Sequence, residues 1–286
     1  MKTLKYLLPC LLGFVFVQCT EKINIKLDNT SPRLVVDGAI TTDTTAHKIK
    51  LATSTDYFYN QPAPAVTGAL VTINDGSSTT ILTEKPVGSG SYETPTTFFG
   101  IPGKTYSLHI ELKEALNGQK IYDATETMPK QLKIDSIQME FKQDIFKKGA
   151  WETKLYAQDP LDENFYCFRG YRNDVLVTDT LDRVTITDDK LFNGRYTNGI
   201  SVLYWNQNMD WEVIHTGDRI KLQLGSLTKN YFNFIQELQL EVGEKNPLFS
   251  GPSANVRTNI TNGGIGYFAA YSTCYASTKV KPITTK

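Results

Sequence analysis

Short alternating segments, each closed by a glycine or proline turn, recur along most of this chain and constrain its fold more than any other feature. HKIKLA at 47–52 and IDSIQMEF at 134–141 alternate polar and apolar residues with the period of two that is typical of half-buried strands. Asp75-Gly76 lies between two such segments, where a hairpin turn needs a residue that accepts positive φ. Strands of this spacing predict a mainly β fold built as a β-sandwich.

The sequence pattern differs before and after Met128-Pro129, and we place the boundary between two predicted domains there. Residues 32–130 are expected to form an immunoglobulin-like or transthyretin-like β-sandwich, and residues 131–286 a second, β-rich domain. Within the second domain, residues 182–199 are polar and predicted to be irregular. The glycine-rich run at 262–266 precedes a strand instead of opening a helix, so it is interpreted as a turn and not as a phosphate cradle. The strands expected in the second domain are 134–141, 151–157, 165–171, 175–180, 220–224 and 266–272.

One amphipathic helix is predicted at about 227–242, and we expect it to pack on a sheet. Its apolar residues follow one another at spacings of four and three, which places them on one stripe of the helix. Ser226 is the predicted N-cap and Gly243 the predicted end. The members of the stripe are Leu227, Tyr231, Phe234, Ile235 and Leu238.

The N-terminus has the pattern of an export signal. Lys2 and Lys5 precede an apolar run at 6–17 that is too short to span a bilayer as a permanent helix. Phe16-Val17-Gln18-Cys19 resembles a bacterial lipobox. We therefore predict removal of residues 1–18, acylation of Cys19 with fatty chains such as palmitate, and a tether at 19–31.

Charge and cysteine content narrow the classes of partner. Lys and Arg total 30 and Asp and Glu also total 30, so no basic excess favours nucleic acid as a partner. Cys167 and Cys274 remain in a chain predicted to reach a compartment where disulfides persist. A bridge between them and two free thiols both fit the sequence, because sequence does not set the distance between their Cα atoms.

No constellation in the sequence indicates catalysis, a metal or a cofactor. His47, His109 and His215 lie far apart and have no metal-ligand spacing, and no Gly-x-Ser-x-Gly elbow is present. Two acidic clusters fall in predicted loops, where we expect solvated charge. Their alternative interpretation is a carboxylate pair of a hydrolase or a calcium site. The clusters are Asp159, Asp162 and Glu163, and Asp188 with Asp189.

Neighbouring aromatic residues give the strongest indication of a binding surface. Adjacent residues of a strand point to opposite sides, so some of these rings should be exposed. Exposed aromatic rings in loops are suited to contact a partner protein or the face of a sugar. The alternative is that they cover sheet edges and close the domain interface. The candidates are Tyr57, Phe58 and Tyr59 in a proline-bearing loop, and Tyr204, Trp205 and Trp211 in a weakly patterned region.

Several segments, in their order and spacing, resemble one family. They are RLVVDG, AVTGALVTINDG, GIPGKTYSLHI, MP followed by IDSI, GDRIKLQLGSLTKNYFNFIQELQ and NPLFSGPSANVRTNITNGGIGYFAAYS. Together they resemble the Bacteroidota lipoproteins with domain of unknown function 4249, over nearly the whole predicted mature chain. The resemblance implies an outer-membrane lipoprotein with a sandwich-like first domain, and implies no catalytic residues.

The resemblance also bears on partners and modification. Members of such families often lie beside TonB-dependent receptors, which by association suggests a capture subunit. Only Glu21 stands in place of an acidic run after the cysteine, so surface and periplasmic exposure both stay open. Three short segments resemble the O-glycosylation consensus of this phylum, with Thr44 and Thr180 as candidates and Ser136 expected to be the most buried.

The expected function is that of a non-enzymatic outer-membrane lipoprotein that binds or captures a ligand of unknown identity, together with a TonB-dependent receptor, in nutrient uptake. The alternatives are a carbohydrate-active or other hydrolase of the cell envelope, which would need two convergent acids in one cleft, and a structural or adhesive envelope protein.

Overall fold

A nine-stranded sheet forms the centre of the structure, a computed structural model that describes residues 31–55, 61–243 and 256–283. Its order is β12-β11-β15-β16-β1-β2-β6-β5, with β13 paired to β11 at one side. All neighbours are antiparallel except β1 and β16. The strands are β1 (Leu34–Thr41), β2 (Lys48–Thr53), β5 (Thr83–Glu84), β6 (Ser91–Glu93), β11 (Phe165–Arg172), β12 (Val175–Leu176), β13 (Thr185–Asp188), β15 (Arg219–Leu227) and β16 (Ile265–Lys279).

The long strand β16 joins the two predicted domains in this one sheet. Its first half, from Ile265 to Tyr271, pairs with β1, and its second half, from Ser272 to Lys279, pairs with β15. Strands from both sides of residue 130 therefore share a continuous set of backbone hydrogen bonds. The described residues from Pro32 onward form one compact unit.

Gly266 makes the parallel contact between β1 and β16 sterically feasible. The turn predicted at 262–264 is present, and β16 enters the sheet directly after it. Gly266 lies opposite Val36 and has a φ of 90°. A Cβ at this position would lie 2.0 Å from the carbonyl oxygen of Val36. Both the positive φ and the close approach of β1 require glycine.

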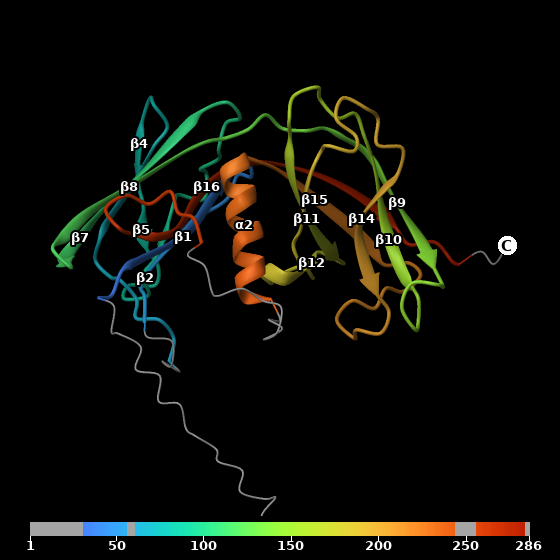
Figure 1. The fold of residues 1–286 in the computed structure, drawn as a ribbon, viewed down its shortest axis with the longest axis horizontal. Coiled ribbons are helices and arrows are strands. Elements are labelled where there is room, and N and C mark those ends of the chain that lie inside the picture. Colours follow the sequence, from blue (N-terminus) through green and yellow to red (C-terminus); the bar gives the residue numbers. More distant parts are fainter. Residues whose placement is uncertain (1–30, 56–60, 244–255, 284–286) are drawn as a thin grey trace, which may run out of the picture. The chain divides into compact units, whose positions relative to one another are not determined.

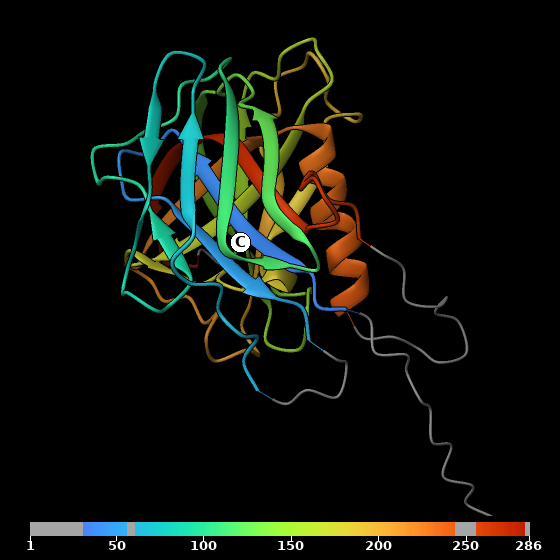
Figure 2. The same ribbon diagram turned by 90° about the vertical axis from the view of Figure 1, so that its left-hand side faces the viewer.

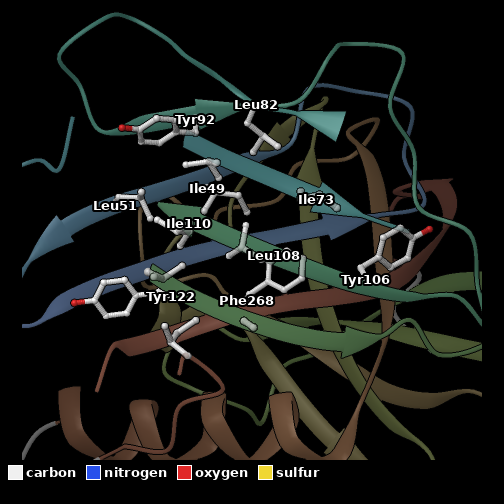
Figure 3. Packing of buried hydrophobic residues seen from close by; sticks show 14 of the residues in the cluster. Ile49, Leu51, Ile73, Leu82, Tyr92, Tyr106, Leu108, Ile110, Tyr122 and Phe268 are labelled. Carbon is white, nitrogen blue, oxygen red and sulfur yellow. The ribbon is translucent and has the colours of Figure 1, made fainter. Parts of the chain in front are cut away.

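A four-stranded sheet, in the order β4-β3-β7-β8, packs on the part of the central sheet that contains β1 and β2 (Figure 2). The hairpin predicted at Asp75-Gly76 connects β3 to β4. Phe268 of β16, Ile49 of β2 and Leu108 of β7 meet in the shared core (Figure 3). The strands are β3 (Leu70–Asn74), β4 (Thr79–Ile81), β7 (Thr105–Leu116) and β8 (Gln119–Thr127).

A three-stranded sheet, in the order β14-β10-β9, packs on the part that contains β11 and β15. Its strands are β9 (Ile134–Lys142), β10 (Ala150–Ala157) and β14 (Ile200–Asn206). Trp205 of β14 and Leu155 of β10 contact Phe168 and Leu224 in this second core. Phe268 and Leu224 lie on the same face of the central sheet, which we call the packed face.

The helix α2 (Lys229–Val242) covers part of the other face of the central sheet, which we call the helix face (Figure 1). Phe232 and Ile235 of α2 pack with Cys167, Leu227 and Tyr271 of the sheet. The prediction of a mainly β fold with one packed helix is therefore confirmed. No helix in the three described ranges has the length and apolar character needed to cross a membrane.

The start of α2 differs from the prediction, whereas its end agrees. Thr228, and not Ser226, is the N-cap, and its Oγ1 accepts a hydrogen bond from the Tyr231 N–H at 3.2 Å. Ser226 and Leu227 belong to β15, because their pairing with β11 and β16 extends that strand. Gly243 ends the helix by donating its N–H to the carbonyl oxygen of Gln239.

The segment between β11 and β15 contains more regular structure than predicted. A short 3-10 helix, η1 (Leu181–Arg183), and β13 occupy part of 182–199, and β14 follows. The strand expected at 175–180 is limited to the two residues of β12. These elements position the side chains of the candidate site.

Candidate binding groove

A groove with a volume of about 560 Å³ lies where η1, β14 and the segment after β14 come together. Two of the predicted binding aromatics, Tyr204 and Trp211, line it and are exposed to 52% and 46%. The residues at its wall include Phe146, Asp182, Arg183, Tyr204, Trp205, Asn206, Met209, Trp211 and Glu212. We call this the aromatic groove.

Strand β14 separates the roles of Tyr204 and Trp205. Because neighbours on a strand point to opposite sides, Tyr204 faces outward while Trp205 enters the core and is only 2% exposed. The indole Nε1 of Trp205 donates to the Thr153 hydroxyl at 2.8 Å, and the ring packs against Gly170. Trp205 therefore forms part of the wall of the groove from within the core and is not a free binding ring.

Arg183 holds the ring of Trp211 at the edge of the groove. Its guanidinium lies 4.8 Å from the ring centroid, and its Nη1 contacts Asp179 at 2.9 Å. A cation over the indole face restricts the orientation of the ring and leaves almost half of the side chain accessible. Trp211 is thus a positioned and exposed aromatic surface.

Polar groups surround the two exposed rings. The Glu212 carboxylate accepts a hydrogen bond from the Asn206 N–H at 2.7 Å, and the Asn206 side-chain oxygen accepts from the Asn208 N–H at 2.9 Å. A hydrogen bond from Thr180 lowers the pKa of Asp182, so this carboxyl is ionised at neutral pH. One cation and two carboxylates line the groove, which gives no excess of positive charge for an anionic ligand.

Sequence reasoning missed Arg183, Phe146 and Met209. Phe146 and Met209 are large exposed hydrophobic side chains, at 50% and 40%. Arg183 lies in the polar stretch that was predicted to be irregular, and only the fold brings η1 beside Trp211. No local pattern in the sequence indicates that contact.

The other predicted aromatics and the lipidation site lie outside the described residues. This applies to Tyr57, Phe58 and Tyr59, and to Cys19 with its signal and tether up to residue 30. Their roles stay predictions.

The two cysteines are free, and a bridge between them is excluded by the sheet register. Cys167 of β11 lies opposite Gly225, whereas Cys274 of β16 lies opposite Leu224. Gly225 and Leu224 are neighbours on β15, so the two thiols are on opposite faces of the sheet with one strand between them. The correct alternative is therefore two free thiols, one in the core with α2 and the other against the three-stranded sheet.

The prediction that both acidic clusters are solvated is wrong for one residue of each cluster. Asp159 and Asp189 are buried at 2% and 1% exposure. Asp159 accepts a hydrogen bond from the Tyr166 hydroxyl at 2.7 Å and one from the Gly194 N–H at 3.1 Å, and burial raises the pKa of its carboxyl. Asp189 accepts from the Asn164 N–H at 2.9 Å. The hydrogen bonds to Gly194 and Asn164 connect the loop before β11 with the loop after β13.

Asp162 is exposed, and the remaining two acids and the histidines have separate partners. Glu163 pairs with Lys229 and Asp188 with Lys190, at 3.1 and 2.6 Å. Each of the three histidines contacts a different residue, namely His47 with Thr41, His109 with Asp123 and His215 with Asp218. Among the described residues, no group of three or more His, Cys, Asp or Glu side chains is placed to hold a metal ion.

The candidate glycosylation residues Thr44 and Thr180 are both exposed. Ser136, which was expected to be the most buried of the three sites, is exposed as well. It lies near the start of β9, with its side chain on the outer side of the three-stranded sheet. Modification at these sites stays a prediction.

Comparison with known proteins places the chain in a family. No curated protein matches it. The sequence profile of a domain of unknown function (DUF4249) matches residues 20–274, which include every element described above except the end of β16. The chain therefore belongs to the DUF4249 family.

Proposed function

We propose that this protein is a non-enzymatic binding protein of the bacterial outer membrane, of the Bacteroidota lipoprotein type. It is held there by lipid on Cys19 and acts with a TonB-dependent receptor in nutrient uptake. The observation that supports a binding role is the aromatic groove, in which Tyr204 and Trp211 are exposed at fixed positions beside polar groups. A cluster of exposed apolar side chains with polar groups around it is typical of a ligand or partner site.

The chemistry of the groove favours a neutral, polyhydroxylated ligand such as an oligosaccharide. The rings of Tyr204 and Trp211 offer flat apolar surfaces, and the carboxylates of Asp182 and Glu212 accept hydrogen bonds from hydroxyl groups. A volume of about 560 Å³ is within the range of small-molecule sites. Because the Arg183 guanidinium is already occupied by Asp179 and Trp211, an anion gains little there.

Binding to a glycan panel tests this proposal. We expect the full chain, purified with its lipid, to bind at least one class of soluble oligosaccharide. Trp211→Ala and Tyr204→Ala should each weaken that binding by about ten- to a hundredfold, because an aromatic anchor typically contributes about 1.4–2.7 kcal/mol. Phe99→Ala is the matched control, since Phe99 is also an exposed aromatic residue, at 52%, but lies between β6 and β7 away from the groove.

Two results would contradict the proposed ligand or role. Equal binding by wild type, Trp211→Ala and Phe99→Ala would exclude the groove as the site. Release of shortened glycans during the incubation would favour the hydrolase alternative.

The anchor and the receptor are tested in membranes. Cys19→Ala should release the protein from the washed membrane fraction without a change in its melting temperature. Affinity purification of the wild type from detergent-solubilised membranes should recover a TonB-dependent receptor. Retention of Cys19→Ala in the membrane, or recovery of no receptor-type protein, would contradict this part of the proposal.

A further inference from the structure

A second pocket lies on the helix face of the central sheet, at the side of α2. It has a volume of about 400 Å³ and is formed by residues far apart in the sequence. Lys48 and Lys50 come from β2, Arg169 from β11, Tyr271 from β16 and Tyr231 from α2. We call this the Arg169 pocket.

Arg169 is a cation of this pocket that makes no ion pair with another described residue. Its Nε is buried and has no hydrogen-bond partner, and no ion pair to its guanidinium is found in the described ranges. By contrast, Arg183, Arg219 and Arg257 each contact a carboxylate. A buried charge without a partner is costly, and buried charges in proteins are normally paired. Arg169 is intermediate in exposure, and no carboxylate in the described ranges neutralises it.

The groups nearest to Arg169 do not supply that negative charge. Burial raises the pKa of the Cys167 thiol to about 11 and that of the Tyr271 hydroxyl to about 12, so both are uncharged at neutral pH. Burial also raises the pKa of the Tyr231 hydroxyl. The guanidinium, in contrast, stays protonated at any physiological pH.

The lysines of β2 add positive charge to the same face. Lys48 pairs with Glu93 at 3.2 Å, whereas Lys50 has no ion pair in the described part of the chain. Asp37 also lines the pocket and lies opposite Lys50 in the register of β1 and β2. Three cations and one carboxylate line the pocket, so its charge favours an anion.

A larger and mostly apolar cavity adjoins the Arg169 pocket. It has a volume of about 890 Å³ and shares Asp37, Phe234 and Tyr267 with that pocket. Leu181, Val35 and Leu238 contribute to its apolar wall along α2. A ligand that fills both spaces would have an apolar body and a charged end.

We propose that the Arg169 pocket binds the carboxylate or phosphate head of an amphiphilic anion, with the apolar body of the ligand lying in the adjoining cavity along α2. The planar guanidinium forms two parallel hydrogen bonds to such a head group, and Lys50 adds charge beside it. This site is separate from the aromatic groove, so either proposal can fail without the other.

Thermal unfolding of the full chain in nanodiscs of zwitterionic lipid, with added decanoate, tests the proposal. At about 100 times its Kd, decanoate should raise the melting temperature of the wild type by about 5–10 °C. Arg169→Gln should lose most of this shift, and Arg169→Lys should show an intermediate shift because it keeps the charge but not the paired donors. The matched control is Arg219→Gln, which removes a guanidinium already paired with Asp174 and should keep the full shift.

The ligand series separates the head group from the apolar body. Decyl phosphate should act like decanoate, whereas decanol and acetate should each give a much smaller shift. Equal shifts in wild type, Arg169→Gln and Arg169→Lys, or none in wild type, would overturn the proposal. So would a decanol shift as large as that of decanoate. Anionic phosphatidylglycerol in the nanodiscs tests whether the anionic head group comes from a membrane lipid. Stabilisation by this lipid but not by decanoate would overturn the proposal that the pocket and the adjoining cavity take up an amphiphile from solution.

Discussion

The two faces of the nine-stranded sheet are covered in different ways. Two smaller sheets cover the packed face. The side chains of the central sheet on this face are almost all apolar and buried, such as Val36, Leu224 and Phe268. One helix covers part of the helix face, where Lys50 and Arg169 share the surface with tyrosines. Successive residues of a strand point to opposite faces of the sheet. The same strands can therefore present apolar side chains on one face and charged side chains on the other.

This difference separates a closely packed surface from one that is only partly covered. On the packed face, each apolar side chain contributes through burial and close packing, and a charged group would have no partner. On the helix face, the incomplete cover leaves two adjoining cavities and an unpaired guanidinium. Substitutions should therefore cost more stability on the packed face than on the helix face.

Phe268→Ala should have the largest effect on stability. Phe268 is fully buried on the packed face and contacts residues of both the central and the four-stranded sheet. Truncation of such a ring typically costs about 3–5 kcal/mol, the sum of lost burial and a cavity. Urea unfolding of the full chain measures this, and a loss below about 1 kcal/mol would contradict the assignment of this face as the main core.

Gly266→Ala should come next, with a loss of about 2–4 kcal/mol. The added Cβ collides with the backbone of Val36, which has no freedom to move within the parallel pairing. Gly263→Ala is the matched comparison, because Gly263 also has a positive φ but open space around it. Its loss of stability measures the cost of the positive φ without a steric collision. Equal losses in the two variants would show that the contact between β1 and β16 is not the cause.

Thr228→Ala tests the helix face and should cost about 1 kcal/mol. It removes the hydroxyl that caps α2. The loss should be several times smaller than that of Phe268→Ala. A larger loss than Phe268→Ala would reverse the ranking of the two faces.

The smallest effect is a dependence on pH that arises at Glu126. Its carboxylate accepts a hydrogen bond from the Tyr267 hydroxyl at 2.8 Å, and burial raises the pKa of Glu126. A carboxyl that holds its proton to higher pH in the folded chain favours folding below its ordinary pKa, and this contribution is lost as pH rises through the folded-state pKa. The stability of Glu126→Gln relative to wild type should therefore rise as the pH is raised above 4.5, the ordinary pKa of a glutamate, because only the wild type loses this contribution. A relative stability that is constant, or that falls with pH, would contradict the burial effect.

The sequence predicted the elements whose pattern follows one period. β9, β10 and α2 were recognised because one face of each is apolar and the other polar, and the hairpin at Asp75-Gly76 because its turn has a specific steric requirement. β14 was not predicted, since Val202, Leu203 and Trp205 are all buried and leave no alternation.

Other errors have their cause in contacts between distant segments. Ser226 has the chemistry of a cap, but pairing with two strands holds it in β15. Asp159 is in a loop of polar composition, but the Tyr166 hydroxyl and the Gly194 N–H bind it in the interior. No local pattern in the sequence shows which carboxylates come near Arg169, so only the folded sheet reveals that no described carboxylate pairs with it.

The central functional claim is that Tyr204 and Trp211 line a ligand site. The fluorescence of tryptophan measures it directly, because Trp211 is exposed while Trp151 and Trp205 are buried. We predict that acrylamide quenches one component of the emission in the free protein, and that a saturating oligosaccharide identified in the panel protects this component. Quenching that is unchanged at saturation would contradict the account.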